Sequence, residues 1–279
     1  MGLIYVADPF APTGNGPGIV YVFPQRGIDP QPIAEIRDGI ERPEGLAVDA
    51  DGTLYVANNG DNTIKAYRAG EMRPSKIYQI PHPYMGVDDV AVGPDRTVYA
   101  SGSSRKGFIA EFPKGSTQAG LVIKMNTDAI AVDAGNNLYA VLAASPAQVY
   151  VFSPGSTRGT SLDFTMGLSY GIAIDAQHHI VVADLGTQSI EIFAEGFQQP
   201  LRTITDGVVN PARLAFDARG NHLYVTVADD YSTCPTGACR IVVGYEYPRD
   251  RIFSAFFFAS PVIVTGFAYG IALSPAVYH

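Results

Sequence analysis

Apolar residues along the chain occur in short runs, and turns that contain Gly, Asn or Asp separate these runs. In the segment RPEGLAVDADGTLYVANNGDNTIKAY, which covers residues 42–67, two runs and the start of a third are joined in this way. Short runs bounded by such turn residues are typical of β-strands. Apolar and polar residues alternate only imperfectly in the first run, as expected for a strand buried on both faces. The pattern therefore predicts an all-β chain.

The same group of runs recurs along the chain. Each copy has an alanine in its first run, as in EGLAVDA, and successive alanines are mostly about 42 residues apart, close to the length of a four-stranded propeller blade. The aligned alanines are Ala47, Ala91, Ala131, Ala173, Ala215 and Ala272. Most copies continue with a second run, a third run that ends on an aromatic residue, and a fourth apolar run.

The last copy, YGIALSP, lacks the later runs, and the beginning of the chain supplies them as LIYVAD, IVYVF and PIAEI. A blade shared between the two ends of the chain closes the ring and removes free sheet edges. The sequence thus predicts one domain over residues 1–279, a six-bladed β-propeller of four-stranded blades. The expected blades are about 40–80, 84–125, 126–165, 167–206, 208–258, and 262–279 plus 1–38.

The phrase PEGLAVDADGTLYVANNGDNTI resembles an NHL repeat, and similar phrases follow over the whole chain. This resemblance implies a six-bladed propeller. It does not imply one function, because such repeats occur in ligand- and protein-binding domains, in secreted amidating lyases and in relatives of the sugar lactonases.

Composition narrows the choice of partners. The chain has 19 Lys and Arg residues against 27 Asp and Glu residues, a net charge of -8, without a Lys/Arg cluster long enough to follow a phosphate backbone. Nucleic acid and anionic membrane surfaces are therefore not expected as partners. The richest apolar stretch, 252–266, is interrupted by Ser254, Ser260 and Pro261, so no membrane span is predicted. We expect an exported monomer whose leader has been removed.

The two cysteines, Cys234 and Cys239, stand in CPTGAC. Four intervening residues with Pro and Gly make a closable loop, which predicts a local disulfide and an oxidising compartment. Two free thiols are the alternative. A zinc site would need two further ligands, which no neighbouring Cys or His supplies.

Candidate chemistry lies at the positions three residues before the aligned alanines. These positions begin the first strands and should surround one end of the central channel, here called the mouth. They are Glu44, Asp88, Asp128, Tyr170, Ala212 and Tyr269. Two long loops, 8–18 and 228–239, would form a wall over the same end.

Three carboxylates that converge on one axis repel one another, unless a cation binds, a proton is shared or water screens them. The sequence therefore suggests a divalent cation such as calcium on Glu44, Asp88 and Asp128, and solvated acidic positions are the alternative. Tyr170, Tyr269 and Arg213 are the candidate ligand-binding residues. Arg213 follows its mouth position by one residue, as Asp89 does, and both are expected to turn toward a neighbouring blade. No motif indicates a nucleotide or organic cofactor.

A second resemblance bears on this site. The regucalcin and gluconolactonase relatives are six-bladed propellers that hold a divalent metal at the mouth, with ligands at this same position. Glu44 in PEG matches their glutamate, whereas Asp88 and Asp128 stand in different contexts and Ala212 occupies a position where a ligand is expected. The resemblance implies a metal-dependent lactonase or esterase in which Asp128 would act as the base.

Two classes of function follow. The first is a binding module that takes a small molecule, peptide or protein at the mouth, and the second is the metal-dependent hydrolase. A purely structural scaffold is a third alternative. No mouth position carries histidine, which argues against the zinc amidating lyases, whose metal ligands are histidines.

Overall fold

The computed structural model describes residues 2–11, 16–25, 30–104, 106–227, 238–259 and 269–275, and for 238–240 and 255–259 it describes the backbone alone. Over these ranges, the strands form six four-stranded antiparallel sheets, here numbered blades I to VI. The prediction of an all-β, six-bladed propeller with four strands per blade is confirmed. None of the described ranges contains a helix with the length and apolarity needed to cross a membrane.

The strands of each blade, from the axis outward, are as follows. Blade I contains β24 (Ile271–Leu273), β1 (Leu3–Asp8), β2 (Ile19–Pro24) and β3 (Ala34–Ile36); blade II contains β4 (Pro43–Val48), β5 (Leu54–Asn58), β6 (Thr63–Tyr67) and β7 (Lys76–Gln79); blade III contains β8 (Asp89–Val92), β9 (Val98–Gly102), β10 (Phe108–Phe112) and β11 (Leu121–Ile123). Blade IV contains β12 (Thr127–Val132), β13 (Leu138–Leu142), β14 (Ala147–Phe152) and β15 (Thr160–Met166); blade V contains β16 (Ser169–Ile174), β17 (Ile180–Asp184), β18 (Ser189–Phe193) and β19 (Arg202–Ile204); blade VI contains β20 (Leu214–Phe216), β21 (His222–Thr226), β22 (Ala238–Glu246) and β23 (Arg251–Ala259).

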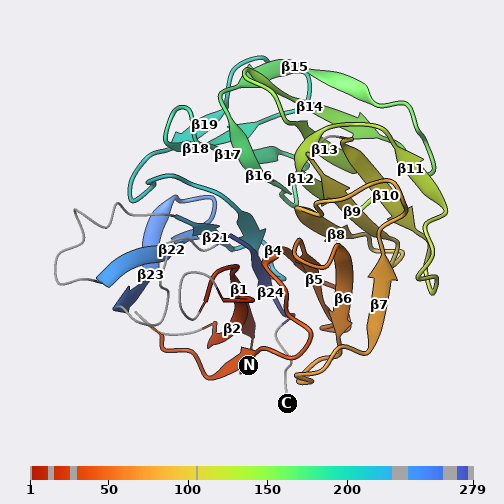
Figure 1. Ribbon diagram of the computed structural model, residues 1–279. Helices are drawn as coiled ribbons and strands as arrows, with labels where there is room; N and C mark the ends of the chain where they lie inside the picture. Colours follow the sequence, from red (N-terminus) through yellow and green to blue (C-terminus); the bar gives the residue numbers. More distant parts are fainter. Residues whose placement is uncertain are drawn as a thin grey trace.

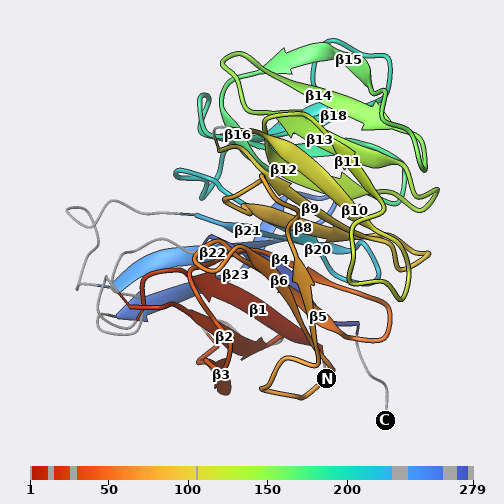
Figure 2. The same cartoon turned by 45° about the vertical axis from the view of Figure 1, so that its right-hand side comes forward.

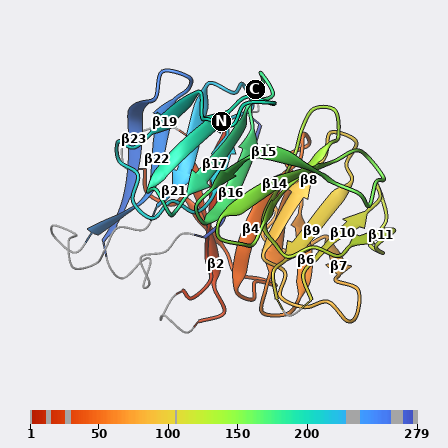
Figure 3. The same cartoon turned by 90° about the horizontal axis from the view of Figure 1, so that it is seen from above.

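The first strands of the blades form the inner wall of the ring. Each of them contacts the first strand of the next blade, in the order β4, β8, β12, β16, β20, β24 and back to β4. In Figure 1, β4, β8, β12 and β16 lie toward the centre, while β7, β11, β15 and β23 lie at the periphery. Seen from above, β23 and β11 mark opposite edges of the molecule, with β4 and β16 between them (Figure 3). All six strand starts therefore surround one axis.

The ring is closed by blade I, as the sequence predicts. Strand β24 pairs with β1 in antiparallel register, with Tyr5 opposite Ala272 and Val6 opposite Ile271. Blade I then packs on blade VI, where Ile4 and Tyr21 share a buried cluster with Tyr224 of β21. Figures 1 and 2 both show β1 and β2 beside β22 and β23.

Two recurring residues explain why the repeated phrase forms a blade. The aromatic residue that ends the third strand is buried between blades, as for Tyr67, Phe112 and Phe193, and the Phe193 ring stacks on Phe164 with centroids 4.0 Å apart. The aspartate that ends the first run organises the hairpin to the second strand. Asp49 Oδ1 accepts hydrogen bonds from the N–H groups of Asp51 (3.0 Å) and Thr53 (2.9 Å), and the aspartates of blades IV and V, Asp133 and Asp175, do the same.

Candidate functional site: the channel mouth

The six mouth positions lie where the first strands begin. Glu44, Asp128 and Tyr170 are the second residues of β4, β12 and β16, and Asp88, Ala212 and Tyr269 come just before β8, β20 and β24. Since these strands contact one another around the ring, the positions surround its axis at one end. The structure thus brings together the residues that the repeat alignment selects.

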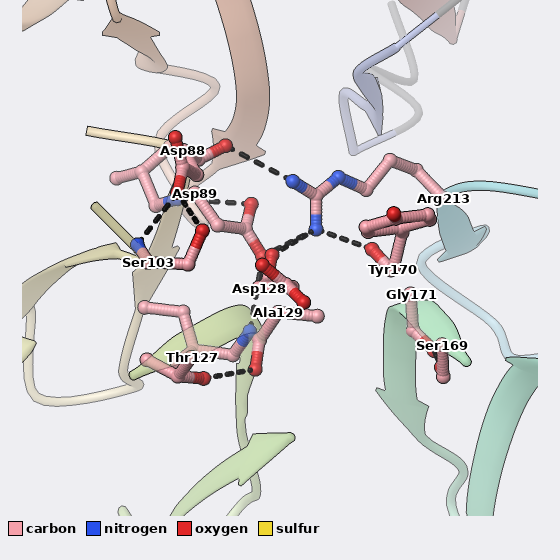
Figure 4. A network of polar contacts seen from close by, with 12 residues as sticks. Asp88, Asp89, Ser103, Thr127, Asp128, Ala129, Ser169, Tyr170, Gly171 and Arg213 are labelled. Atoms are coloured by element: carbon pink, nitrogen blue, oxygen red, sulfur yellow. Dashed lines mark hydrogen bonds and ion pairs between the residues drawn. The ribbon is translucent and has the colours of Figure 1, made fainter. Parts of the chain in front are cut away.

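The axis itself is occupied by the guanidinium of Arg213, which comes from blade VI. Its Nη1 donates to the backbone carbonyls of Asp128 (2.7 Å) and Tyr170 and to Oδ2 of Asp89 (3.2 Å), and Nη2 donates to the carbonyl of Asp88 (3.0 Å). Figure 4 shows the guanidinium between these groups. One side chain therefore ties blade VI to blades III, IV and V across the channel.

Arg213 and Asp89 form a buried ion pair at the bottom of the mouth. The two side chains are each 10% exposed. Besides Arg213, Asp89 accepts hydrogen bonds from the N–H groups of Val90 (2.9 Å) and Ile130 (3.0 Å). Burial raises the pKa of the Asp89 carboxyl, while Arg213 and the two N–H groups act against that rise. A buried charge needs such partners, because an unpaired one costs several kcal/mol.

Two glycines make room for this pair. A Cβ on Gly45 would lie 2.2 Å from Oδ1 of Asp89, and a Cβ on Gly171 would lie 2.2 Å from the carbonyl oxygen of Ala212 and 3.1 Å from the Cα of Arg213. Neither position tolerates a side chain without displacement of a neighbouring blade. The close approach of strand starts at the axis therefore explains why the mouth residues Glu44 and Tyr170 are each followed by glycine.

Both oxygens of the Asp88 carboxylate accept hydrogen bonds within the protein. Its Oδ1 accepts from Nδ2 of Asn59 (3.0 Å), and its Oδ2 accepts from the N–H (2.7 Å) and the hydroxyl (2.8 Å) of Ser103. These donors come from the loops between second and third strands in blades II and III. Asp88 thus fixes two loops of the mouth.

Glu44 is different, since its carboxylate has no hydrogen-bond partner in the described part of the chain. Burial and the nearby Asp88 raise the pKa of Glu44 to about 7, although Arg213 and Arg42 partly oppose this. Burial also raises the pKa of Asp128, against the nearby Ser103 hydroxyl and the charge of Arg213. The pKa of Glu44 therefore lies close to neutral pH.

Aromatic side chains line the rim. Tyr170 is 37% exposed, and Tyr269 is half-buried with its ring against Phe10 at 6.3 Å between centroids. The guanidinium of Arg42 lies over the Phe10 ring, 5.7 Å from its centroid. Met85, in the loop that leads to β8, is 66% exposed. This rim offers apolar contact area around an acidic centre.

The residues present do not fit the predicted divalent metal. In the ranges that the structure describes, no three His, Cys, Asp or Glu side chains form a group that could hold a metal ion. The Asp88 carboxylate already accepts three hydrogen bonds from Asn59 and Ser103, and the positive charge at the axis comes from Arg213. The ligand set Glu44, Asp88 and Asp128 is therefore unsupported, and we derive no chemistry from a metal. The role of Asp128 as a base stays a prediction.

The cavity on the axis is small. It has a volume of about 50 Å³ and is lined by residues of all six first strands, among them Leu46, Ile130, Ile172 and Arg213. Typical small-molecule sites have volumes of about 300–1,000 Å³. This axial cavity therefore has room for little more than water.

Of the two loops predicted to form a wall over the mouth, 8–18 and 228–239, the structure describes mainly the first. The described residues of loop 8–18 fold back on themselves through hydrogen bonds from Gly16 N to Phe10 O (3.0 Å) and from Gly18 N to Ala11 O (3.1 Å), and Pro17 accepts from the N–H of Arg42, beside Glu44. This loop thus lies at the mouth. The predicted disulfide between Cys234 and Cys239, and most of the 228–239 loop with it, lie outside the residues whose side chains are described.

Comparisons with known proteins agree with this architecture. A family model for the NHL repeat matches residues 41–67, the segment that contains Glu44. A chain in the crystal structure of a nidogen/laminin complex superposes with a TM-score of 0.69 at 19% identity, over 98% of this chain and 98% of that one. A protein of unknown function from Bacteroides caccae superposes with a TM-score of 0.72 at 12% identity, over 99% of both chains. No curated protein matches the sequence.

Fold and mouth together define a six-bladed β-propeller that contains an NHL repeat. At these identities the likeness to solved structures establishes the fold alone.

Proposed function

We propose that the protein is a binding module that docks a segment of a partner protein at the mouth. The observation that carries this proposal is the position of the Arg213 guanidinium across the channel, beside an axial cavity of about 50 Å³ and an aromatic rim. A surface of this kind suits a protein or peptide better than an enclosed small molecule.

The composition of the rim supports a protein partner. Tyr170 and Met85 are exposed, and Tyr269 and Phe10 are partly exposed beside them. Aromatic residues and methionine are enriched at the centres of protein interfaces. The fold likeness to a chain of a nidogen/laminin complex fits the same role, since the propeller architecture occurs there within a protein–protein complex.

The charges suggest what the partner presents. Four carboxylates at the mouth (Glu44, Asp88, Asp89 and Asp128) face two guanidinium groups (Arg42 and Arg213). Glu44 lacks a donor within the described residues and sits next to the electron-rich ring of Tyr269. A Lys or Arg side chain would supply both a hydrogen bond and a cation–π contact. We therefore infer that the partner segment carries a basic residue flanked by apolar ones.

Selection of a random peptide library on the wild-type protein tests this proposal. We expect enriched peptides to contain a basic residue and to lose at least about tenfold in affinity for Glu44→Gln, as expected when one charged contact is removed. Tyr170→Ala should also weaken binding, because it removes an aromatic contact. The matched control is Phe197→Ala, because Phe197 is 58% exposed but lies between β18 and β19, at the opposite end of the ring. Peptides that bind all three variants equally, or no enrichment at all, would contradict the proposal.

The hydrolase alternative has its own test. A panel of lactones and esters should show no turnover that depends on Glu44 or Asp128 if the mouth only binds. Turnover by the wild type that is lost in Asp128→Asn would indicate that the mouth is a catalytic site and not only a binding site.

A further inference from the structure

A second cavity lies away from the mouth, between blades II and III. It has a volume of about 300 Å³, within the range of small-molecule sites. Tyr55 and Tyr78, both buried, form part of its lining, with their ring centroids 6.2 Å apart. Four basic side chains line the remainder: Arg68, Lys76, Arg96 and Lys114.

The topology explains why these residues meet. The first and third strands of each blade run away from the mouth, so the residues that follow them lie at the opposite end. Arg68 and Lys114 follow the third strands β6 and β10, and Arg96 belongs to the hairpin after the first strand β8. Lys76 begins the outer strand β7 at the same end. The groove is therefore independent of the site proposed above.

The groove carries an excess of positive charge. Two carboxylates, Asp49 and Asp51, also line it. However, Asp49 is occupied by its own hairpin and by the Tyr55 hydroxyl (3.1 Å), and Asp51 forms a two-pronged ion pair with Arg96 (2.5 and 2.8 Å).

The other three cations of the groove lack a close carboxylate partner among the described residues. Lys76 and Lys114 are exposed and form no ion pair with the described residues, while Arg68 has only Glu71 at 3.8 Å. Such a concentration of positive charge stands out in a chain with a net charge of -8.

The equivalent groove between blades V and VI shows that the blade geometry does not by itself produce unpaired cations. That groove is larger, about 550 Å³, and its arginine on the outer strand, Arg202, is paired with Asp250 at 2.9 Å. The Arg202 guanidinium also lies over the ring of Tyr247, 4.7 Å from its centroid. A cation at the corresponding place is thus neutralised within the protein there, whereas Lys76 is left unpaired.

We propose that the groove between blades II and III binds a small oxyanion-bearing ligand, a phosphate or sulfate ester, through Arg68, Lys76 and Lys114. Convergent cations over a partly enclosed, tyrosine-lined floor supply the charge-assisted hydrogen bonds that such groups require. The groove spans two blades only, so the ligand is a compact molecule and not an extended polymer.

Isothermal titration calorimetry at low ionic strength tests the proposal with two probes, inorganic pyrophosphate and a sulfated disaccharide; the unsulfated disaccharide is the blank. We expect binding of one molecule per chain by at least one probe, and the stronger of the two identifies the source of the oxyanion. The variant Lys76→Gln/Lys114→Gln should lose at least about tenfold in affinity, because each lysine supplies a charged contact.

Lys124→Gln is the matched control, because Lys124 is exposed and follows the outer strand β11 toward the mouth end. Unfolding midpoints equal to that of the wild type would show that the variants are folded. Absence of binding by both probes would overturn the proposal. Equal weakening by Lys124→Gln and by the double variant would also overturn it, because it would indicate a general charge effect.

Discussion

Replacement of Arg213 by methionine should destabilise the propeller more than any exposed substitution. The change keeps an unbranched side chain of similar length but removes the hydrogen bonds to the carbonyls of Asp88, Asp128 and Tyr170 and leaves the Asp89 charge buried without its counterion. Removal of one partner of a buried ion pair typically costs about 3–5 kcal/mol. Domains of ordinary stability have about 5–15 kcal/mol in total, so the loss is a large fraction of it.

Urea unfolding measures this loss. The chain contains no Trp and 16 Tyr residues, so far-UV circular dichroism and tyrosine fluorescence are the two probes. Without the arginine, only the two N–H groups still oppose the effect of burial on the pKa of Asp89. The folded variant therefore takes up a proton more readily than the unfolded chain, and its deficit relative to wild type should shrink as the pH falls from 8 toward 5.

The double variant Asp89→Leu/Arg213→Met separates charge from hydrogen bonding. It removes the uncompensated charge but leaves the three carbonyls without their donor, so we expect a coupling energy of about 2 kcal/mol and only partial recovery. Arg68→Met, with an exposed arginine, is the control and should change stability by less than about 0.5 kcal/mol. A loss of less than about 1 kcal/mol for Arg213→Met would refute the assignment of Arg213 as the tie between blades.

Three further predictions concern the surroundings of this pair. The folded-state pKa of Glu44, about 7, lies above its ordinary value of 4.5, so the free energy of unfolding of the wild type should decrease as the pH rises from 4.5 to 7. The variant Glu44→Gln should lack this decrease, and urea unfolding at pH 8 should show it to be more stable than the wild type by up to about 3 kcal/mol. Gly45→Ala should lower the unfolding midpoint markedly, because its Cβ would meet Asp89 at 2.2 Å, whereas Gly70→Ala, where the Cβ meets nothing within 4 Å but φ is +79°, should cost only about 1 kcal/mol. Asp184→Ala should cost about 3 kcal/mol and speed hydrogen exchange at Gly167, since Asp184 accepts three backbone N–H groups, including that of Gly167 at 2.7 Å; unchanged exchange there would contradict this.

The fold could be predicted because the residue pattern of one blade recurs along the sequence. The aspartate of the first hairpin accepts the hydrogen bonds of that hairpin, and the aromatic residue that ends the third strand packs between blades. Both roles recur in most blades. The split blade was also predictable, since YGIALSP needs partners that LIYVAD supplies, and β24 indeed pairs with β1.

The chemistry of the mouth was harder to predict. Its six positions follow from the repeat, but the ion pair joins Asp89 to Arg213 over 124 residues and across opposite blades. The position after each mouth residue is otherwise glycine or alanine: Gly45, Ala129, Gly171 and Gly270. Two opposite charges at a position of such small residues were the available signal. The sequence predicted that both side chains turn toward a neighbouring blade, whereas Arg213 reaches Asp89 on the opposite blade, because the neighbouring glycines leave space at the axis.

The charge problem that suggested a metal therefore has another solution in this protein. Repulsion among the carboxylates is relieved at Asp89 by Arg213, at Asp88 by Asn59 and Ser103, and at Glu44 by a proton whose pKa is near 7. The hydrogen bonds at Asp88 and Asp89 are part of the ring structure, whereas the pKa of Glu44 lies close to neutral pH. In the proposed binding module, the protonation of Glu44 therefore contributes to the charge that the partner meets at the mouth.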